Sequence, residues 1–399
     1  MVNTMYVPRA LAKTFHEAIS LFPAVLVTGP RQSGKTTFLQ NELKGVNYVT
    51  FDDPLNRDFA LQDTNGFLDR FKGKPVVLDE IQYVPEILQY IKIRIDQERK
   101  PGLWIMSGSQ QFHLMTNVSE TLAGRIAVLE LAPFSLAEAG VQNKALEDVL
   151  WTGLFPEPSC YPEKRDLWIK SYVQTYLERD VRQIENIRNF RAFEMFLNLS
   201  AAFHSQAFHP ASLASDCGVS QPTIKSWSKV LEASYLAVML PPFFKNFGKR
   251  VVKTPKFYLS DPSLVCFFTR QPSEEAALRG NMGGALFEGL IIGEAWKTFL
   301  NHGQRHSAFF WRSHDGLEVD LIIQAQGRLW PVEIKLTSTP SVNHARGLDR
   351  FKRLAGQEAA TQGTIVCNIE KKIDLPGNNV ALPWTLFAGW LERVLDGKV

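Results

Sequence analysis

The segment GPRQSGKT, residues 29–36, has the residue types and the spacing of a loop that binds the phosphates of a nucleotide. Its glycines let backbone N–H groups approach phosphate oxygens, and the helix that starts after the loop adds partial positive charge. Lys35 is expected to reach the β- and γ-phosphates, and Thr36 to ligate Mg²⁺. The residues expected to contact ATP are Gly29, Pro30, Arg31, Gln32, Ser33, Gly34, Lys35, Thr36 and Thr37.

The run PVVLDE supplies the carboxylates that such a site requires on a second buried strand. Asp79 ends the apolar part of this run, where an aspartate would hold Mg²⁺ beside the nucleotide. Glu80 is expected to be catalytic, by orienting or deprotonating the attacking water, although a carboxylate that stabilises a helix N-terminus is the structural alternative. Ser107 ends a third strand, WIMSGS, where its hydroxyl could contact the γ-phosphate or simply belong to a turn.

Two arginines are candidates for the extra cation that phosphoryl transfer usually places beside the γ-phosphate. Arg125 lies in ETLAGRIAVLEL, and Arg179 lies in YLERDV. We expect Arg125 to contact the nucleotide. Either arginine, taken alone, is also typical of an ordinary surface ion pair.

The run EVDLIIQAQGRLWPVEIK has the composition of a metal site on a β-hairpin. Asp320 and Glu333 are expected to meet across the turn and, with the Ile334 carbonyl, to hold Mg²⁺, because hard cations prefer oxygen ligands. Lys335 would orient the water that attacks a phosphodiester. Glu288, on an apolar helix upstream, would complete this catalytic site or bind a second metal ion. A solvated hairpin is the structural alternative, since the pattern E-x-K often arises by chance.

The run LASDCGVSQPTIKSWSKVLEAS, between these two groups, has the pattern of a helix–turn–helix. Gly218 allows the turn, and Ser220 caps a second helix in which Pro222 takes an early position. A basic run without acidic residues follows, as in the wing of a winged helix, and it favours DNA contact over a packing role. Its basic residues are Lys245, Lys249, Arg250, Lys253 and Lys256.

The elements that must position these residues are those of an α/β multidomain protein. From Tyr6 to about Glu138, short apolar runs alternate with helical patterns, which predicts a parallel sheet covered by helices on both faces. A helical segment follows, and a further α/β unit begins near Met282.

The runs VLVTGPRQSGKTT, VVLDEIQ, SGS, LAGRIAVLELAPFSLAE and YLERDV, in this order, resemble a family of prokaryotic AAA-type ATPases with a C-terminal PD-(D/E)xK nuclease-like domain. The resemblance covers nearly the whole chain. It implies a P-loop ATPase domain at residues 1–160 and a helical and winged helix-turn-helix segment at 161–270. Residues 271–399 would form a nuclease-like α/β domain with a restriction-endonuclease-like fold.

The bulk composition excludes several classes of protein. Among 399 residues, 45% are hydrophobic and 21% charged, as in globular proteins, and the net charge of +3 confines any nucleic-acid surface to a local patch. The four cysteines are far apart, which argues against a zinc ribbon or a disulfide framework. Without a signal pattern or a run of ~20 apolar residues, the expected location is cytoplasmic, with no membrane partner.

The function expected from these patterns is ATP binding and hydrolysis, with ATP and Mg²⁺ as cofactors, coupled to DNA binding and metal-dependent DNA cleavage. One alternative is a nucleotide-controlled DNA-binding or regulatory switch with an inactive nuclease-like domain. Another is a remodelling ATPase that acts on a protein partner. A homo-oligomer is compatible with the resemblance, because AAA-type ATPases often form rings.

Overall fold

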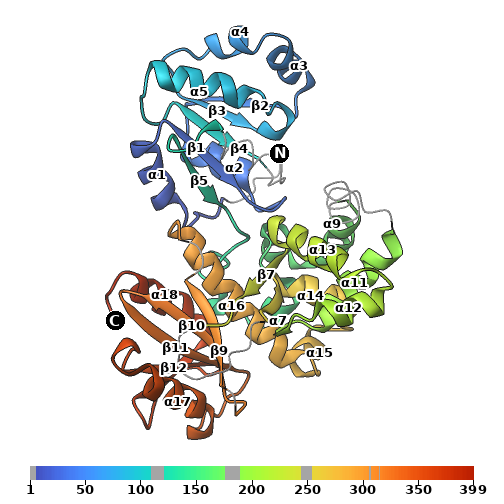
Figure 1. Cartoon of the computed structure of the whole chain (residues 1–399), viewed down its shortest axis with the longest axis vertical. Coiled ribbons are helices and arrows are strands. Elements are labelled where there is room, and N and C mark those ends of the chain that lie inside the picture. The colour runs from blue at the N-terminus through green and yellow to red at the C-terminus, as the bar shows by residue number, and fades with distance from the viewer. Residues whose placement is uncertain (1–5, 109–120, 176–188, 244–253, 305–306, 314) are drawn as a thin grey trace. The chain divides into compact units, whose positions relative to one another are not determined.

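The structure is a computed structural model that describes most of the chain (Figure 1). The residues outside its description are 1–5, 109–120, 176–188, 244–253, 305–306 and 314. Contacts within the chain define two compact units. The first contains residues 1–134 with two short later segments, and the second contains most of residues 135–399. This division is coarser than the three predicted modules, whose boundaries stay a prediction.

Five parallel strands form the central sheet of the first unit, in the order β2-β3-β4-β1-β5. Every neighbouring pair in this sheet is parallel, which confirms the prediction of a parallel-sheet core. Parallel strands need apolar residues on both faces, because helices cover both faces of the sheet. The strands are β1 Ala24–Thr28, β2 Asn47–Thr50, β3 Val76–Asp79, β4 Trp104–Ser107 and β5 Ile126–Glu130.

Two apolar cores cover the two faces of this sheet. Val25 and Val27 of β1 belong to one core, together with Phe38. Leu26 belongs to the other core, together with Phe67, because successive side chains of a strand point to opposite faces. The helices of this unit are α1 Ala12–Leu21, α2 Lys35–Glu42, α3 Pro54–Gln62, α4 Thr64–Asp69 and α5 Ile87–Gln97.

The first part of the second unit is helical and includes a small antiparallel sheet, ordered β6-β8-β7. Its strands are β6 Gln206–Ala207, β7 Ala237–Leu240 and β8 Lys256–Leu259. Its helices are α7 Leu146–Thr152, α8 Pro156–Cys160, α9 Arg165–Tyr172, α11 Phe190–Ala202, α12 Pro210–Cys217, α13 Gln221–Ala233, α14 Pro262–Phe268 and α15 Glu274–Arg279.

Helices α12 and α13 are the two helices predicted around Gly218. This glycine has a φ of 66°, and the Ser220 hydroxyl accepts a hydrogen bond from the Thr223 N–H at 3.3 Å. Ile224 and Trp227 of α13 are buried and belong to the apolar face of this helix. Most of the predicted wing lies outside the described residues, so the winged-helix assignment stays a prediction.

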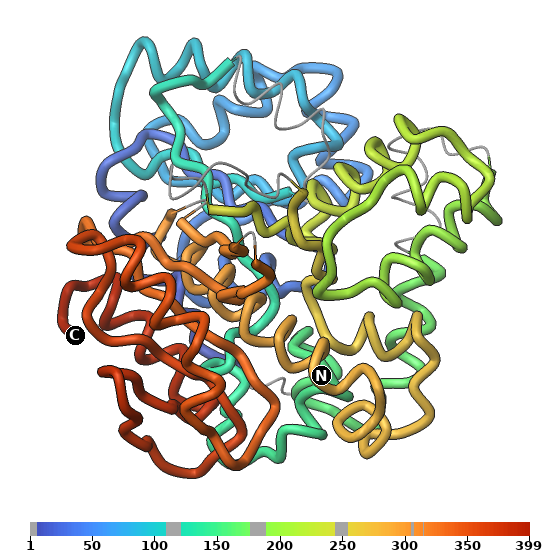
Figure 2. Tube along the Cα trace, turned by 60° about the horizontal axis from the view of Figure 1, so that its bottom comes forward, coloured from blue at the N-terminus to red at the C-terminus, as the bar shows by residue number. Residues whose placement is uncertain are grey.

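The C-terminal part of the second unit is built on a six-stranded sheet, ordered β13-β14-β12-β11-β10-β9. Figure 2 shows this part as the orange-to-red end of the trace. Strands β10 and β11 form the predicted antiparallel hairpin. The strands are β9 Ala308–Arg312, β10 Glu318–Ala325, β11 Arg328–Lys335, β12 Gly363–Cys367, β13 Ile373–Leu375 and β14 Asn379–Pro383. The helices are α16 Gly283–Asn301, α17 Arg346–Ala355 and α18 Phe387–Leu395.

Among the helices that the structure describes, none combines the length and the apolar character needed to cross a bilayer.

Candidate nucleotide and metal sites

The predicted phosphate loop connects β1 to α2. Gly29 has a φ of 149°, and a Cβ there would lie 2.2 Å from the carbonyl oxygen of Leu131, so a larger residue would not fit. Gly34 has a φ of 90° and precedes the first turn of α2. Lys35 opens this helix, is buried, and donates hydrogen bonds to the carbonyls of Gly29 at 3.2 Å and Pro30 at 2.9 Å. Two carbonyl groups of the loop therefore accept hydrogen bonds from the buried ammonium group of Lys35.

The surroundings of Lys35 favour an anionic ligand. Burial lowers the pKa of Lys35 to about 8, against the opposing effects of Glu80 and Asp79. A phosphate beside the ammonium group would stabilise its charged form, which burial alone disfavours. The remaining predicted contacts with ATP lie in the same loop and in the first turn of α2; they are Arg31, Gln32, Ser33, Thr36 and Thr37.

Asp79, the last residue of β3, is the centre of a cluster of hydroxyl groups. The Thr36 hydroxyl donates to its Oδ2 at 2.9 Å, and the hydroxyls of Tyr48 and Ser107 also donate to this carboxylate. Thr36 and Asp79 therefore lie together, as residues that hold Mg²⁺ beside ATP must. Burial and the hydrogen bond to Asp79 raise the pKa of Tyr48, so its phenol stays protonated as a donor. Sequence reasoning missed Tyr48, because no motif marks it.

Glu80 follows Asp79 at the edge of the sheet from which the loop emerges. Its backbone is in the left-handed region, with a φ of 58°, a conformation that costs a non-glycine residue of order 1 kcal/mol. The side-chain amide of Gln82 donates to the Glu80 carboxylate. A turn of unfavourable backbone geometry and a neighbouring amide together fix the position of the predicted catalytic carboxylate.

Arg9 is a second residue of this unit that sequence reasoning missed, because it lies 20 positions before the loop. It is buried, and its guanidinium group donates to the carbonyls of Ser33 at 2.8 Å and Ala132 at 2.6 Å. The same group lies 5.0 Å from the centre of the Phe134 ring. Arg9 therefore connects the phosphate loop to the chain that leaves β5.

We expect Arg9→Ala to lower the free energy of unfolding by about 2–4 kcal/mol, because it leaves buried carbonyl groups without their donor. Urea unfolding followed by circular dichroism would measure the change. Arg99→Ala is the matched control: Arg99 also donates to a carbonyl, that of Gly124 at 3.0 Å, but in an exposed position. It should cost about 0.5 kcal/mol or less. Equal losses for the two variants would contradict the bracing role of Arg9.

The structure does not place Arg125 at the nucleotide site of its own chain. Its carbonyl accepts a hydrogen bond from the Ala24 N–H at the start of β1, whereas the phosphate loop follows Thr28 at the other end. A strand rises about 3.3 Å per residue, so β1 alone separates Arg125 from the loop by roughly 13 Å. Its side chain pairs with Asp96 at 2.6 Å. The predicted contact is therefore wrong within one chain, and the other candidate, Arg179, lies outside the described residues.

The second candidate site lies on the β10–β11 hairpin. The paired register ends with Leu321 opposite Val332, and Asp320 and Glu333 are the next residues on the two strands. Both carboxylates contact the ammonium group of Lys335, so their side chains converge on one side of the hairpin. Both carboxylates are also buried, with 4% and 7% of their surface exposed. A solvated hairpin would leave them in water, so the structure favours the alternative of a built acidic site.

Lys335 joins these two carboxylates. Its Nζ lies 3.2 Å from Asp320 Oδ2 and 2.8 Å from Glu333 Oε1. Burial alone would lower the pKa of Lys335, but Asp320 and Glu333 raise it above its ordinary value, so the ammonium form is favoured. The Ile334 N–H also donates to Asp320 Oδ2, at 2.8 Å. Oδ2 of Asp320 therefore has two donors, whereas Oδ1 points away from Lys335 and toward Lys256.

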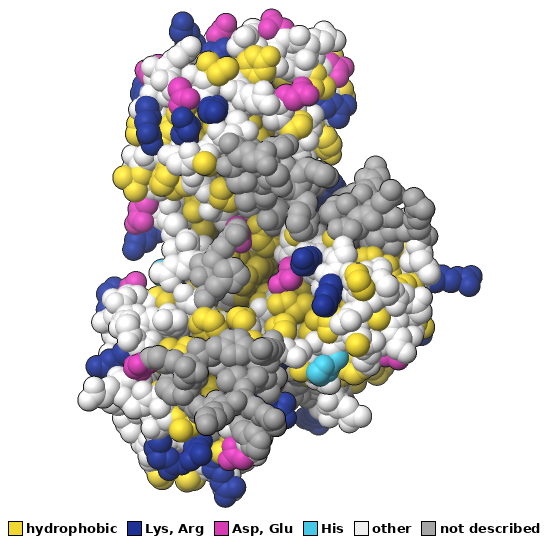
Figure 3. Space-filling model, viewed as in Figure 1, with side chains coloured by type: hydrophobic (Ala, Val, Ile, Leu, Met, Phe, Trp, Pro, Cys, Tyr) yellow, Lys and Arg dark blue, Asp and Glu magenta, His cyan; other side chains and the backbone are white. Residues whose placement is uncertain are grey.

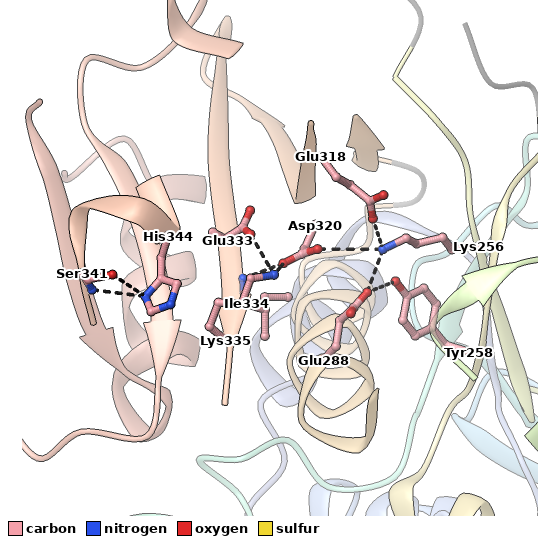
Figure 4. A network of polar contacts seen from close by, with 10 residues as sticks. All are labelled: Lys256, Tyr258, Glu288, Glu318, Asp320, Glu333, Ile334, Lys335, Ser341 and His344. Atoms are coloured by element: carbon pink, nitrogen blue, oxygen red, sulfur yellow. Dashed lines mark hydrogen bonds and ion pairs between the residues drawn. The ribbon is translucent and has the colours of Figure 1, made fainter. Parts of the chain in front are cut away.

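Lys256 lies among the acidic residues of the same site (Figure 4). Its Nζ is 2.9 Å from Glu288 Oε1 and 3.8 Å from Asp320 Oδ1, and it also contacts the carboxylate of Glu318. The side chain is buried, so the prediction of Lys256 as part of a basic DNA-binding run is wrong. The physical reason is that β8 directs this lysine into the acidic cluster and away from solvent.

Glu288 of α16 lies in the cluster, as predicted, but its carboxylate is hydrogen-bonded to residues of β8. Its Oε1 accepts hydrogen bonds from Lys256 and from the Tyr258 hydroxyl, the latter at 2.7 Å. Burial and the nearby Asp320 raise the pKa of Glu288. Sequence reasoning missed Tyr258 and the acidic Glu318, because the relevant contacts join distant parts of the chain.

A metal ion in this cluster would need carboxylate oxygens that have no other partner. In the described part of the chain, no three His, Cys, Asp or Glu side chains are arranged to hold one metal ion. Glu333 Oε2, however, is buried without a hydrogen-bond partner, and burial and Asp320 raise the pKa of Glu333 to about 8. Mg²⁺ usually takes one or two carboxylates and completes its shell with water. Asp320 and Glu333 therefore fit a single divalent ion.

The acidic cluster lies in a cleft of about 740 Å³ within the second unit. Arg312 and Arg346 also line this cleft, so cationic groups surround its acidic residues. Arg350 and Arg353 of α17 are exposed as well. Lys and Arg side chains gather at the lower end of the view in Figure 3, where Figure 1 shows α17. The combination of an acidic cluster and a basic rim suits a ligand that carries phosphate groups.

Comparison with known proteins divides the chain into three matches. Residues 21–140 match a family described as AAA domain. Residues 143–275 match a domain of unknown function (DUF8612), and residues 283–387 match a second one (DUF4143).

Two mycobacterial proteins match most of the chain. They are the uncharacterized protein Rv2008c of Mycobacterium tuberculosis (strain ATCC 25618 / H37Rv) and the uncharacterized protein Mb2031c of Mycobacterium bovis (strain ATCC BAA-935 / AF2122/97). Each is 30% identical over 342 residues, which are 84% of this chain and 76% of the relative. Among solved structures, the Walker-type ATPase PABY2304 of Pyrococcus abyssi has a TM-score of 0.42 and 14% identity, over 65% of this chain and 94% of that chain. That similarity is too low to establish a common fold.

Proposed function

The chain belongs to the family of the mycobacterial proteins Rv2008c and Mb2031c and is an AAA-type ATPase, and from this premise we propose that it couples ATP hydrolysis to the binding and metal-dependent cleavage of DNA. The ATPase part rests on the AAA domain and on the loop that surrounds Lys35. The nuclease part rests on the second unit alone.

The observation that carries the nuclease proposal is the convergence of the Asp320 and Glu333 carboxylates on the ammonium group of Lys335, in a cleft that Arg312 and Arg346 also line. A divalent ion bound by the two carboxylates would activate water and stabilise the charge that develops on a phosphodiester. Lys335 would orient the attacking water, because its ammonium group already spans both carboxylates. These are the roles expected of the D and E-x-K positions of a PD-(D/E)xK domain.

DNA is the proposed substrate because the cationic groups near the site face solvent. Arg346 lines the cleft, and Arg350 lies one turn further along α17. On α13, Lys225 and Lys229 are exposed, in positions from which a helix–turn–helix could contact phosphates. We propose that the helix–turn–helix, as part of a winged helix, holds DNA while the cleft receives one strand.

A nucleotide-controlled DNA-binding switch is the second candidate, and one observation favours it. The ammonium group of Lys256 contacts three carboxylates that could otherwise serve a metal ion. A domain whose acidic residues are neutralised by its own lysine could bind DNA without cleaving it.

The test is an assay of ATP hydrolysis and DNA cleavage on one preparation of the full chain. Supercoiled plasmid and single-stranded DNA would be incubated with Mg²⁺ or Mn²⁺, with and without ATP, and EDTA would serve as the control. We expect nicked or fragmented DNA that requires the divalent ion. ATP turnover stimulated by DNA without cleavage would support the switch instead. ATP turnover indifferent to nucleic acid would support a remodelling ATPase that acts on a protein.

A further inference from the structure

We propose that Lys256 is a built-in second cation of the acidic cluster, so that the cleft holds one divalent ion, at Asp320 and Glu333, and not two. This inference rests on the proposed metal site. In this arrangement Glu288 and Glu318 bind the ammonium group of Lys256. The sequence had instead suggested that Glu288 completes the metal site or binds a second metal ion.

The geometry of Lys256 is that of a cation shared by several ligands. Its Nζ lies 2.9 Å from Glu288 and 3.8 Å from Asp320, and it contacts Glu318 as well. These three carboxylates come from α16 and β10, and no other cation touches Glu288 among the described residues. A metal ion at the same point would have to displace the ammonium group.

Lys256 is held firmly in this position by its own strand. It pairs with Ala207 of β6 on one side and with Leu240 of β7 on the other. Its Nζ also lies 5.6 Å from the centre of the Phe310 ring, and only 7% of the residue is exposed. A lysine on a central strand, with its side chain buried, does not swing out to solvent to admit an ion.

The charges of the cluster suit one divalent ion. When all four carboxyl groups are ionised, as metal binding would favour, they face two ammonium groups, which leaves two negative charges; the residues are Glu288, Glu318, Asp320, Glu333, Lys256 and Lys335. Arg312 lies 3.7 Å from Glu318, and this contact is weaker because the Arg312 side chain is half exposed to water. One divalent ion compensates the remaining charge, and a second would bring an excess of positive charge into a buried site.

The partners of Asp320 leave one of its oxygens available to a metal ion. Its Oδ2 accepts from the Ile334 N–H and from Lys335, while Oδ1 faces Lys256 at 3.8 Å. That distance is longer than a hydrogen bond, so Oδ1 keeps a free coordination site. Glu333 Oε2, the buried oxygen without a partner, supplies the second ligand. A divalent ion on Oδ1 would thus share Asp320 with the ammonium group of Lys256, which lies beyond hydrogen-bond distance of that oxygen.

The experiment is a Mn²⁺ titration of the nucleotide-free full chain, followed by electron paramagnetic resonance. The wild type should bind one ion that Asp320→Asn removes. Glu288→Gln should keep that ion with its affinity changed by less than about 3-fold, because Glu288 serves Lys256. Lys256→Met should bind an additional ion or bind Mn²⁺ at least about 10-fold more tightly, since three carboxylates lose their cation.

Two ions lost together in Asp320→Asn, or a loss of affinity above about 10-fold in Glu288→Gln, would overturn the inference while leaving the proposed metal site in place. An unchanged affinity and number of ions in folded Lys256→Met would overturn it as well. If Lys256→Met does not fold, Glu288→Gln decides the question alone. If the wild type binds no ion that Asp320→Asn removes, the metal site of the proposed function fails, and the inference fails with it.

Discussion

Glu80→Gln is expected to reduce ATP turnover by about 10²-fold or more while ATP binding stays close to wild type. The substitution keeps the size and the hydrogen-bonding shape of the side chain but removes the negative charge that orients or deprotonates water. The left-handed turn at Glu80 and the amide of Gln82 hold this carboxylate beside Asp79, so no neighbouring group moves easily into its place. Phosphate release and binding of a fluorescent ATP analogue would measure the two effects separately.

Two further variants show whether the loss of ATP turnover comes from weaker activation of water or from weaker binding of the nucleotide. Lys35→Ala should lose tight ATP binding, because its ammonium group serves the phosphates in the ground state as well as in the transition state. Glu86→Gln, an exposed glutamate six residues after Glu80, should leave both binding and turnover unchanged. Turnover at the wild-type rate in Glu80→Gln would remove Glu80 from the catalytic residues.

Asp320→Asn should abolish divalent-ion-dependent DNA cleavage, with a loss of at least about 10²-fold, and leave ATP turnover within about 2-fold of wild type. The substitution keeps the shape of the side chain and removes the charge that a cation requires. ATP turnover should survive because the nucleotide site uses Lys35, Thr36 and Asp79, which belong to the other unit. Plasmid nicking and phosphate release, measured on the same sample, would report both activities.

Lys335→Ala should also lose cleavage, but it should retain the metal ion, since an ammonium group is not a metal ligand. Asp374→Asn is the matched control, because Asp374 is an exposed aspartate on β13 of the same sheet. Cleavage that persists in Asp320→Asn but depends on another residue would move the active site elsewhere. Cleavage that is absent from the wild type under all ionic conditions would favour the nucleotide-controlled switch.

The sequence alone determined the features that depend on neighbours along the chain. The phosphate loop is a strand, a turn and a helix in one stretch, so the glycines and Lys35 can be identified without knowing the rest of the fold. The hairpin is similar, because 13 positions and a tight turn suffice to bring the carboxylates of Asp320 and Glu333 to the same ammonium group, that of Lys335. The parallel sheet followed from the repeated alternation of buried runs and helical patterns.

Only the tertiary structure decided the contacts between distant segments. Tyr48 reaches Asp79 because β2 lies beside β3, and Arg125 is remote from the loop because parallel strands place their amino ends at the opposite edge. Lys256 has the sequence neighbours of a basic wing, yet it points into an acidic cluster formed by α16 and β10. A local pattern records which residues can carry charge, but the packing of remote elements determines which charges meet, and burial then fixes how strongly they interact.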